Sequence, residues 1–259
     1  YNLENYRVQA GDGVKAKADE SRDAVATIIA EGGGDIVGVC EMGGRDAVED
    51  LRAKLAAKGR VYPFVELVEG PDRDRHLALL SRFPIVVRSS RAHVPYEIAG
   101  AHHLMKRGIL DVTVSLTGGY SLRLVGVHLK SKLPIPEGEA LVRRMEAQLL
   151  RTHLDGVLQM NPKVNLLVYG DLNDTKDQVA VREILGAKES LLGLIDLPAV
   201  DTAGDRWTHY WKVADVYSRI DYLLVSKGLR EEVVSGSAVI SANPLWKTAS
   251  DHRMLSVRI

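Results

Sequence analysis

The sequence has little of what would place it in several common classes of protein. Cysteine occurs once, at Cys40, so no intrachain disulfide can form and the redox compartment stays open. No run of eighteen apolar residues is present, so the sequence contains no candidate for a membrane-spanning helix. A cluster of Cys and His residues is missing too, which argues against a structural zinc site. The remaining pattern is that of a globular protein.

A net charge is also missing, because 34 Lys and Arg residues balance 34 Asp and Glu residues. No overall positive field would draw in polyanions, which argues against broad non-specific DNA binding and leaves a local basic patch open. Hydrophobic residues make up 46% of the chain, enough for a sizeable core. No repeat, low-complexity tract or linker-like change of composition interrupts the chain, so we expect one domain over residues 1–259.

The spacing of apolar residues predicts many strands with helices between them. Helices are expected from Ser21, as N-cap, to about Glu31, and over residues 46–58, 138–159 and 176–186. Strands are expected at 35–40, 61–68, 76–81, 85–94, 108–116, 121–128, 164–169, 206–211, 219–226, 235–241 and 253–259. Residues 7–20, residues 72–75 and the pair His102-His103 are expected in loops, the last two without a catalytic role. This order favours helices packed outside β-sheets.

The longest predicted helix, 138–159, and the first residues carry further expectations. Its apolar face is predicted to contain Leu141, Met145, Leu149 and Val157. The chain begins at Tyr1 with a run typical of the end of a strand, so we expect the first half of that strand upstream. A removed signal peptide or tether is compatible with this start, which keeps an exported or periplasmic location open.

The stretch 165–174 is the most informative one. Its apolar residues predict a buried strand that ends at Gly170, and Asp171 and Asn173 follow two positions apart, where an extended backbone points both to one side. Ligands of α/β sheets lie outside such strand ends. Asp171 and Asp174 are equally explained as residues of a turn or as caps of the following helix.

Other polar residues also end or interrupt apolar runs: Asn2, Glu41, His128, Asp221, Asp251 and His252. A helix cap would explain Glu41, and a hydrogen-bonded core position would explain either histidine. Asp221 lies inside an apolar strand, where a carboxylate is costly unless it is paired. A histidine or a metal ion is its natural partner.

Six motifs in this order resemble the endonuclease/exonuclease/phosphatase superfamily, the Mg²⁺-dependent phosphoesterases with a deoxyribonuclease-I-like fold. The matching stretches are residues 1–5, 35–41, 127–132, 169–174, 218–222 and 250–252, which span nearly the whole chain. The resemblance implies a four-layer α/β/β/α sandwich of two mixed β-sheets flanked by helices. It also implies an active site where the strand ends of both sheets meet.

The resemblance implies a role for each matched polar residue. Glu41 corresponds to the main Mg²⁺ ligand, with Asn2 and Asp251 on the metal side, and Mn²⁺ is expected to substitute. The implied catalytic residues are His128, Asp171, Asn173, Asp221 and His252. Within this set His252 is the essential histidine with Asp221 as its carboxylate partner, and it acts either as a general base or as a cation that holds the phosphate.

Two basic residues and an aromatic cluster are weaker candidates. Arg107 and Lys130 are expected to bind the substrate phosphate, although strand-end Arg and Lys residues are usually just solvated. The residues Trp207, His209, Tyr210 and Trp211 are expected either to stack on a base or sugar or to pack on a strand face.

The resemblance indicates the reaction more closely than the substrate. The motifs at residues 128–132 and 170–175 resemble those of bacterial nuclease-like members. We therefore expect a phosphodiesterase whose phosphoester substrate is a nucleic acid. The protein is expected to be a monomer. A phosphomonoesterase, or a phosphoesterase acting on inositol phosphates or phospholipids, is the alternative. A catalytically silent binding module is disfavoured because every motif residue named above is present.

Overall fold

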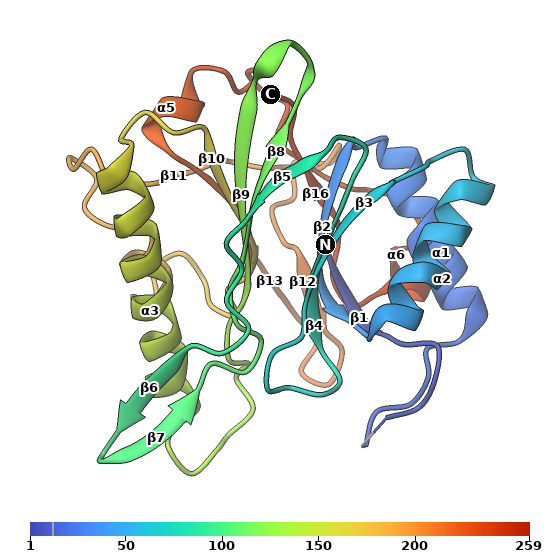
Figure 1. The fold of residues 1–259 in the computed structure, drawn as a ribbon. Helices are drawn as coiled ribbons and strands as arrows, with labels where there is room; N and C mark the ends of the chain where they lie inside the picture. The colour runs from blue at the N-terminus through green and yellow to red at the C-terminus, as the bar shows by residue number, and fades with distance from the viewer. Residues whose placement is uncertain (12) are drawn as a thin grey trace.

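Two mixed β-sheets face each other in the computed structural model, which describes residues 1–11 and 13–259 (Figure 1). The first sheet has the order β1 (Asn2–Tyr6), β2 (Ile36–Met42), β4 (His76–Ser81) and β3 (Phe64–Val68). The second has the order β11 (Ile195–Asp196), β14 (Asp221–Val225), β10 (Leu166–Asp171), β9 (Ser121–His128), β8 (Leu110–Ser115) and β5 (Ile85–Arg88). The pairs β1–β2 and β9–β10 are parallel, and the other pairs are antiparallel.

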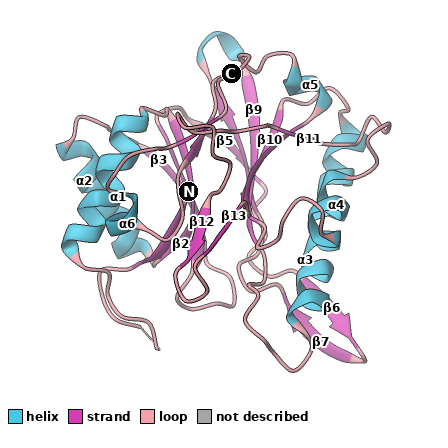
Figure 2. Cartoon of the chain, turned by 180° about the vertical axis from the view of Figure 1, so that it is seen from behind, coloured by secondary structure: helices cyan, strands magenta, loops and turns pink. Residues whose placement is uncertain are grey.

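Helices cover the outer face of each sheet (Figures 1 and 2). On the first sheet lie α1 (Asp19–Gly32), α2 (Arg45–Ala57) and α6 (Trp246–Ala249). On the second lie α3 (Glu139–Met160) and α4 (Val179–Leu185), while α5 (Lys227–Arg230) follows β14. The expected four-layer sandwich of two mixed sheets flanked by helices is therefore confirmed.

The inner strands β4, β9, β10 and β14 are buried on both faces along most of their length. In β10, Leu166 and Val168 pack toward α3 and α4, whereas Leu167 and Tyr169 pack toward the first sheet. Successive side chains of a strand point to opposite faces, so a strand buried on both faces is continuously apolar. This is why the strands of the core could be recognised from their composition.

Three short strand pairs lie outside the two sheets: β6 (Pro95–Ile98) with β7 (Ala101–Leu104), β12 (His209–Trp211) with β13 (Val216–Ser218), and β15 (Val239–Ile240) with β16 (Leu255–Ser256). The expected loop at His102-His103 is wrong, since both residues lie in β7. The expected strands 85–94, 206–211, 235–241 and 253–259 are shorter than predicted, because much of their length has no ladder partner that would keep it in regular structure.

Two details of the helices also differ from expectation. Helix α1 begins at Asp19 without a side-chain cap, so Ser21 lies inside its first turn, where Asp19 and Glu20 already offset the positive end of the helix dipole. In α3 the buried face is shifted, and Leu141 is 45% exposed. The shift arises because Arg143 and Glu146 occupy buried positions of this helix, and polar residues there obscure the apolar pattern.

Tyr169 sits between the two sheets, against two residues that have no side chain. A Cβ atom on Gly38 of β2 would lie 2.2 Å from Tyr169 Cε2, and one on Gly126 of β9 would lie 2.6 Å from Tyr169 Oη. The tyrosine ring fills the space that two side chains would otherwise need. The spacing of the two sheets at this level depends on glycine at both positions.

No helix in the described part of the chain, residues 1–11 and 13–259, is long and apolar enough to cross a membrane. The monomeric state and the single-domain organisation stay predictions.

We predict that Gly38→Ala lowers the free energy of unfolding by about 1–3 kcal/mol, because the added methyl group overpacks the space held by Tyr169. Gly156→Ala is the matched control. Gly156 lies in α3 with open space around it, so alanine there should raise stability by about 0.5–1 kcal/mol. Urea unfolding of the three proteins measures both effects, and a Gly38→Ala protein as stable as the wild type would contradict the role given to Tyr169.

Candidate active site

Three strands of the second sheet carry His128, Asp171 and Asp221 side by side. Asp171, the last residue of β10, pairs with His128 of β9 in the parallel ladder and with Asp221 of β14 in the antiparallel one. Asp171 lies two positions after Tyr169 and therefore points, like Tyr169, toward the first sheet. The register of the sheet thus gathers three titratable groups at one end of the intersheet space.

Glu41 reaches the same place from the first sheet through a bulge. Val37 and Val39 of β2 pack toward α1 and α2, and strict alternation would send Glu41 the same way. The register of β2 instead shifts between Cys40 and Met42, and Glu41 has a φ of 60°. This irregularity turns the carboxylate toward the site, where Asn5 N donates to Glu41 Oε2 at 3.0 Å.

Asn2 joins the two sheets. Its Nδ2 donates to Asp171 Oδ2 at 3.0 Å and lies 3.4 Å from Glu41 Oε1, while its Oδ1 accepts the backbone N–H of Glu4. In this orientation the amide nitrogen faces the two carboxylates. The amide oxygen, which is the atom that would bind a metal ion, accepts the N–H of Glu4. The metal-ligand role expected for Asn2 stays a prediction.

Backbone strain is concentrated around these groups. Among residues 1–11 and 13–259, six non-glycine residues have a positive φ, and four of them lie here: Glu4, Asn5, Glu41 and Asn173. The other two, Ala99 and Asp215, lie in the turns of the β6–β7 and β12–β13 hairpins. Such conformations cost free energy and persist where the surroundings enforce them, which is typical of functional sites.

His252 and Asp221 form a buried pair. His252 Nδ1 lies 2.8 Å from Asp221 Oδ2, and its other nitrogen, Nε2, lies 3.7 Å from Asp171 Oδ2. Ser250 holds the segment in place, since its Oγ accepts the N–H of His252 and donates to the carbonyl of Asn2. The partner expected for the carboxylate inside β14 is therefore this histidine.

The neighbouring charges decide the protonation of the pair. Burial alone would lower the pKa of His252, but the charge and hydrogen bond of Asp221, with Asp171 in addition, raise it to about 10. Burial raises the pKa of Asp171 to about 7, against the opposing effect of the His252 charge. These shifts favour the cationic form of His252 at neutral pH, and Asp171 holds a proton more readily than an ordinary aspartate.

His128 has the opposite character. Burial, followed by the charges of Arg107 and His252, holds its pKa well below the usual value for histidine. Its Nε2 lies 3.6 Å from Asp171 Oδ2 and 3.9 Å from Glu41 Oε1. The site thus presents one neutral and one charged imidazole on either side of Asp171.

The helix-cap alternatives do not hold. Helix α4 begins at Val179, and Asp171 Oδ1 accepts the N–H of Asn173 at 2.8 Å within the loop before it. Asn173 in turn donates from Nδ2 to the carbonyl of Leu129. Asp174 is not a cap either, because it forms a buried pair with Arg143 Nε of α3 at 3.0 Å. Glu41 also caps nothing, since Gly44 precedes α2.

The two candidate phosphate-binding residues differ in their surroundings. Arg107 Nη2 pairs with Asp72 Oδ2 at 3.0 Å, and its buried Nε has no hydrogen-bond partner in the described part of the chain. Its charge acts on His128, which places it near the site. Lys130 Nζ donates to Leu133 O at 2.8 Å and to Ser131 O at 3.0 Å, so its ammonium group is held by its own loop.

Arg75 was not expected at the site. Its Nε lies 3.7 Å from Glu41 Oε2, and its loop, 72–75, is anchored by Asp72, whose Oδ1 accepts the N–H of Arg75. The available signal was its position directly before the apolar strand β4. The sequence alone did not show that this strand start faces β2.

The aromatic cluster is divided between packing and exposure. Trp207 packs against the guanidinium of Arg253 at 4.2 Å, and its ring centroid lies 5.1 Å from that of Trp246. Trp211 of β12 is 54% exposed. Packing therefore explains Trp207, whereas a substrate contact stays open for Trp211.

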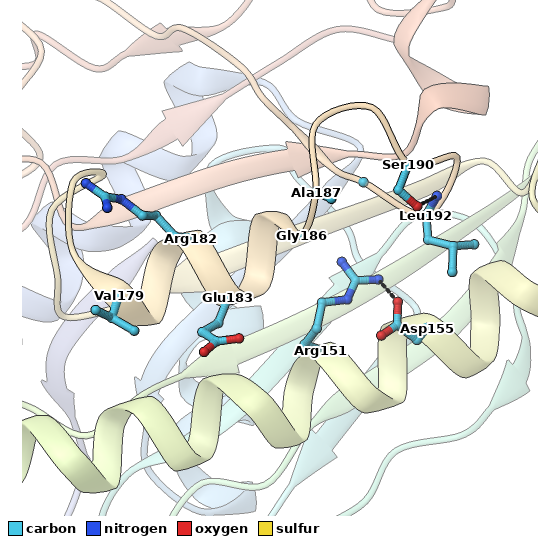
Figure 3. A pocket seen from close by; sticks show the side chains of 10 residues that line it. Arg151, Asp155, Val179, Arg182, Glu183, Gly186, Ala187, Ser190 and Leu192 are labelled. Carbon is cyan, nitrogen blue, oxygen red and sulfur yellow. Dashed lines mark hydrogen bonds and ion pairs between the residues drawn. The ribbon is translucent and has the colours of Figure 1, made fainter.

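One hollow lies away from this cluster, and another borders it at Asp221. One, of about 540 Å³, opens between α3 and α4, where Arg151 pairs with Asp155 at 2.8 Å (Figure 3). Another, of about 1070 Å³, runs between the sheets from Tyr169 toward the last residues of the chain. Glu41, His128 and His252 line neither hollow, whereas Gly170 and Asp221 line the second one.

Comparison with known proteins identifies the fold and the family. The family described as "Endonuclease/Exonuclease/phosphatase family" matches residues 2–252. Similar solved structures include an endonuclease/exonuclease/phosphatase from Bacteroides vulgatus (17% identity, TM-score 0.70, 100% of this chain and 96% of that one). A family protein from Leptotrichia buccalis (15%, 0.69, 100% and 97%) and sphingomyelinase C from Streptomyces griseocarneus (17%, 0.63, 99% and 93%) are also similar. No curated protein matches the chain.

At such low sequence identities, the similar structures establish the fold alone. The family is established by the family match, which covers residues 2–252. The chain belongs to the endonuclease/exonuclease/phosphatase family of phosphoester hydrolases.

Proposed function

We propose that the chain is a phosphodiesterase of nuclease type that depends on a divalent cation, and that the cluster around Asp171 is its active site. The observation that carries this proposal is the buried His252–Asp221 pair, whose imidazole lies 3.7 Å from Asp171, while Asn2 links Asp171 to Glu41. Phosphoryl transfer requires positioning and neutralisation of negative charge more than covalent catalysis by the protein.

The donor set supports a hard cation. Glu41 and Asp251 offer carboxylate oxygens, and both side chains are partly exposed, at 16% and 42%. We propose that these two residues hold Mg²⁺, with Mn²⁺ as a substitute, since Mg²⁺ favours oxygen ligands and keeps several waters. When bound, the cation would polarise a phosphoryl oxygen.

The remaining groups supply charge neutralisation, proton transfer and hydrogen bonding. His252, as a cation, neutralises charge that develops on the phosphoryl oxygens. Asp171 has a pKa near neutrality, so it is suited to accept a proton from an attacking water. His128 is neutral and can donate one hydrogen bond to the phosphate or the leaving group. Asn173 fixes the Asp171 carboxylate through its backbone N–H.

The substrate is the least constrained part of the proposal. The resemblance to bacterial nuclease-like proteins favours a nucleic acid, and the balanced net charge favours weak, site-directed binding over tight duplex binding. The likeness to a sphingomyelinase C supports a second candidate, a phospholipid diester. Both candidates are phosphodiesters.

We expect the wild-type protein to nick plasmid DNA and to hydrolyse bis-p-nitrophenyl phosphate with Mg²⁺ or Mn²⁺, and to lose the activity with a chelator. His252→Ala and Glu41→Ala should each lower kcat/KM by about 10²–10⁴-fold, since each removes one charge that the reaction needs. His93→Ala, which changes an exposed histidine, is the control.

Parallel assays with RNA, sphingomyelin vesicles and p-nitrophenyl phosphate separate the candidate substrates. Hydrolysis of the monoester alone would replace the diesterase proposal with a phosphatase. Equal activity of the wild type and both site variants would mean that the hydrolysis comes from a contaminant.

The charged state of His252 predicts how stability depends on pH in the metal-free protein. Its pKa rises from 6.5 to about 10 on folding, so protonated His252 stabilises the fold fully below pH 6.5, and this contribution is lost as the pH rises through 10. The free energy of unfolding should therefore fall between pH 7 and 9, by up to about 1.4 kcal/mol per pH unit.

Asp221→Asn should flatten this dependence, because the pKa of His252 then loses its main upward influence. Urea unfolding at pH 7, 8 and 9 in the presence of a chelator measures the two slopes. Identical slopes for both proteins would show that His252 is not held as a cation by Asp221.

A further inference from the structure

The start of β12 forms hydrogen bonds with two segments of the site, the one that carries Asp221 and the one that carries Asp251 and His252. Thr208, just before the strand, is fully buried, and its Oγ1 accepts the N–H of Asp221 at 3.1 Å. His209 forms an isolated antiparallel bridge with His252, and Tyr210 N donates to the carbonyl of Asp251 at 2.9 Å. The β12–β13 hairpin thus supports the backbone of the site although it belongs to neither central sheet.

Asp251 lacks a firm side-chain contact within its own segment. Its carboxylate is 42% exposed, and Ser250 Oγ approaches its Oδ1 only at 3.5 Å. His252 Nε2 lies 3.9 Å from the same oxygen. Both of these contacts are made to Oδ1, so neither of them fixes the position of Oδ2.

His209 reaches the other oxygen of this carboxylate. Its Nε2 lies 3.6 Å from Asp251 Oδ2, so the carboxylate stands between two imidazoles. The His209 ring is itself held, because its centroid lies 4.6 Å from that of His252 and its Nδ1 lies 3.5 Å from Ser218 Oγ of β13. With 19% of its side chain exposed, His209 is placed to restrain Asp251 from the solvent side.

We propose that His209 is a positioning residue of the active site, which holds Asp251 in the orientation that keeps its Oδ1 toward His252. The inference rests on the proposed function, since it assigns a role within the same site. Loss of His209 lets Asp251, the second proposed cation ligand, turn into solvent, so that one of the two carboxylates near His252 Nε2 leaves the site. We therefore expect the chemical step to become slower while substrate binding is unchanged.

Two substitutions separate this role from simple packing. His209→Phe keeps a planar ring and removes Nε2, and His209→Gln keeps an N–H donor near the Nε2 position. With bis-p-nitrophenyl phosphate, His209→Phe should lower kcat by about 10–100-fold, the usual effect of losing a partner that orients a ligand or catalytic group. KM should stay nearly constant, and His209→Gln should recover most of kcat. Val213→Ala, at an 88% exposed position of the same hairpin, should behave as the wild type.

A double-mutant cycle tests whether His209 acts through Asp251. Asp251→Asn should lower kcat, and adding His209→Phe to it should lower kcat no further, because the group that His209 positions is already gone. Multiplicative losses would overturn the proposal. A rise in KM at unchanged kcat would also overturn it, since His209 would then be a substrate contact.

A measurement that needs no activity keeps the two proposals separate. The Hα–Hβ coupling constants of Asp251, measured by NMR, should report one χ1 rotamer in the wild type, an average in His209→Phe and one rotamer again in His209→Gln. Averaged couplings in the wild type would overturn the inference whatever the activity. If the wild type hydrolyses no phosphoester but shows this pattern, the proposed function fails and the positioning contact stands.

Discussion

The hydrogen bond from Asn2 Nδ2 to Asp171 Oδ2 ties together the two halves of the molecule on which the site depends. Asn2 belongs to the first sheet and Asp171 to the second, and the bond can form only where the two sheets approach closely. That approach is possible because Tyr169 lies against Gly38 and Gly126 a short distance deeper in the sandwich. The packing of one tyrosine against two glycines therefore sets the geometry of the polar groups at the strand ends.

Within this frame the site is a balance of buried charges. Four carboxylates gather there, on Glu41, Asp171, Asp221 and Asp251, and one imidazolium, on His252, compensates part of their charge. This surplus of negative charge, above all that of Asp221, raises the pKa of His252, whereas burial is the main cause of the raised pKa of Asp171. Such a surplus is a natural place for a cation, and the neighbouring Arg75 and Arg107 are natural partners for an anion.

The layers of the fold and most residues of the polar cluster could be predicted from the sequence, for one physical reason. The strands of a sheet buried on both faces are continuously apolar, so Asp171, Asp221 and His128 stand out as polar residues at their ends. The family resemblance then placed these motifs in one fold, which the family match and the similar structures bear out. The roles of the individual residues stay predictions.

What the sequence did not reveal depends on local backbone irregularity and on contacts across the chain. The bulge at Glu41 has no composition signal, because neither Glu nor its neighbours favour a positive φ. Arg75 was expected in a loop without a catalytic role and His209 in a strand with an aromatic cluster, and only the tertiary structure places them against Glu41 and Asp251. The shifted face of α3 has the same origin, since its buried Arg143 is paired with Asp174, a residue of another segment.

The bond from Ser250 Oγ to the carbonyl of Asn2 has a consequence for folding. It joins residues that are 248 positions apart, and both flank the site. This contact forms only when the long loop between the two residues closes, and closing that loop costs conformational entropy. A chain that has not been synthesised as far as Ser250 lacks this contact, although the residues of both central sheets are already present.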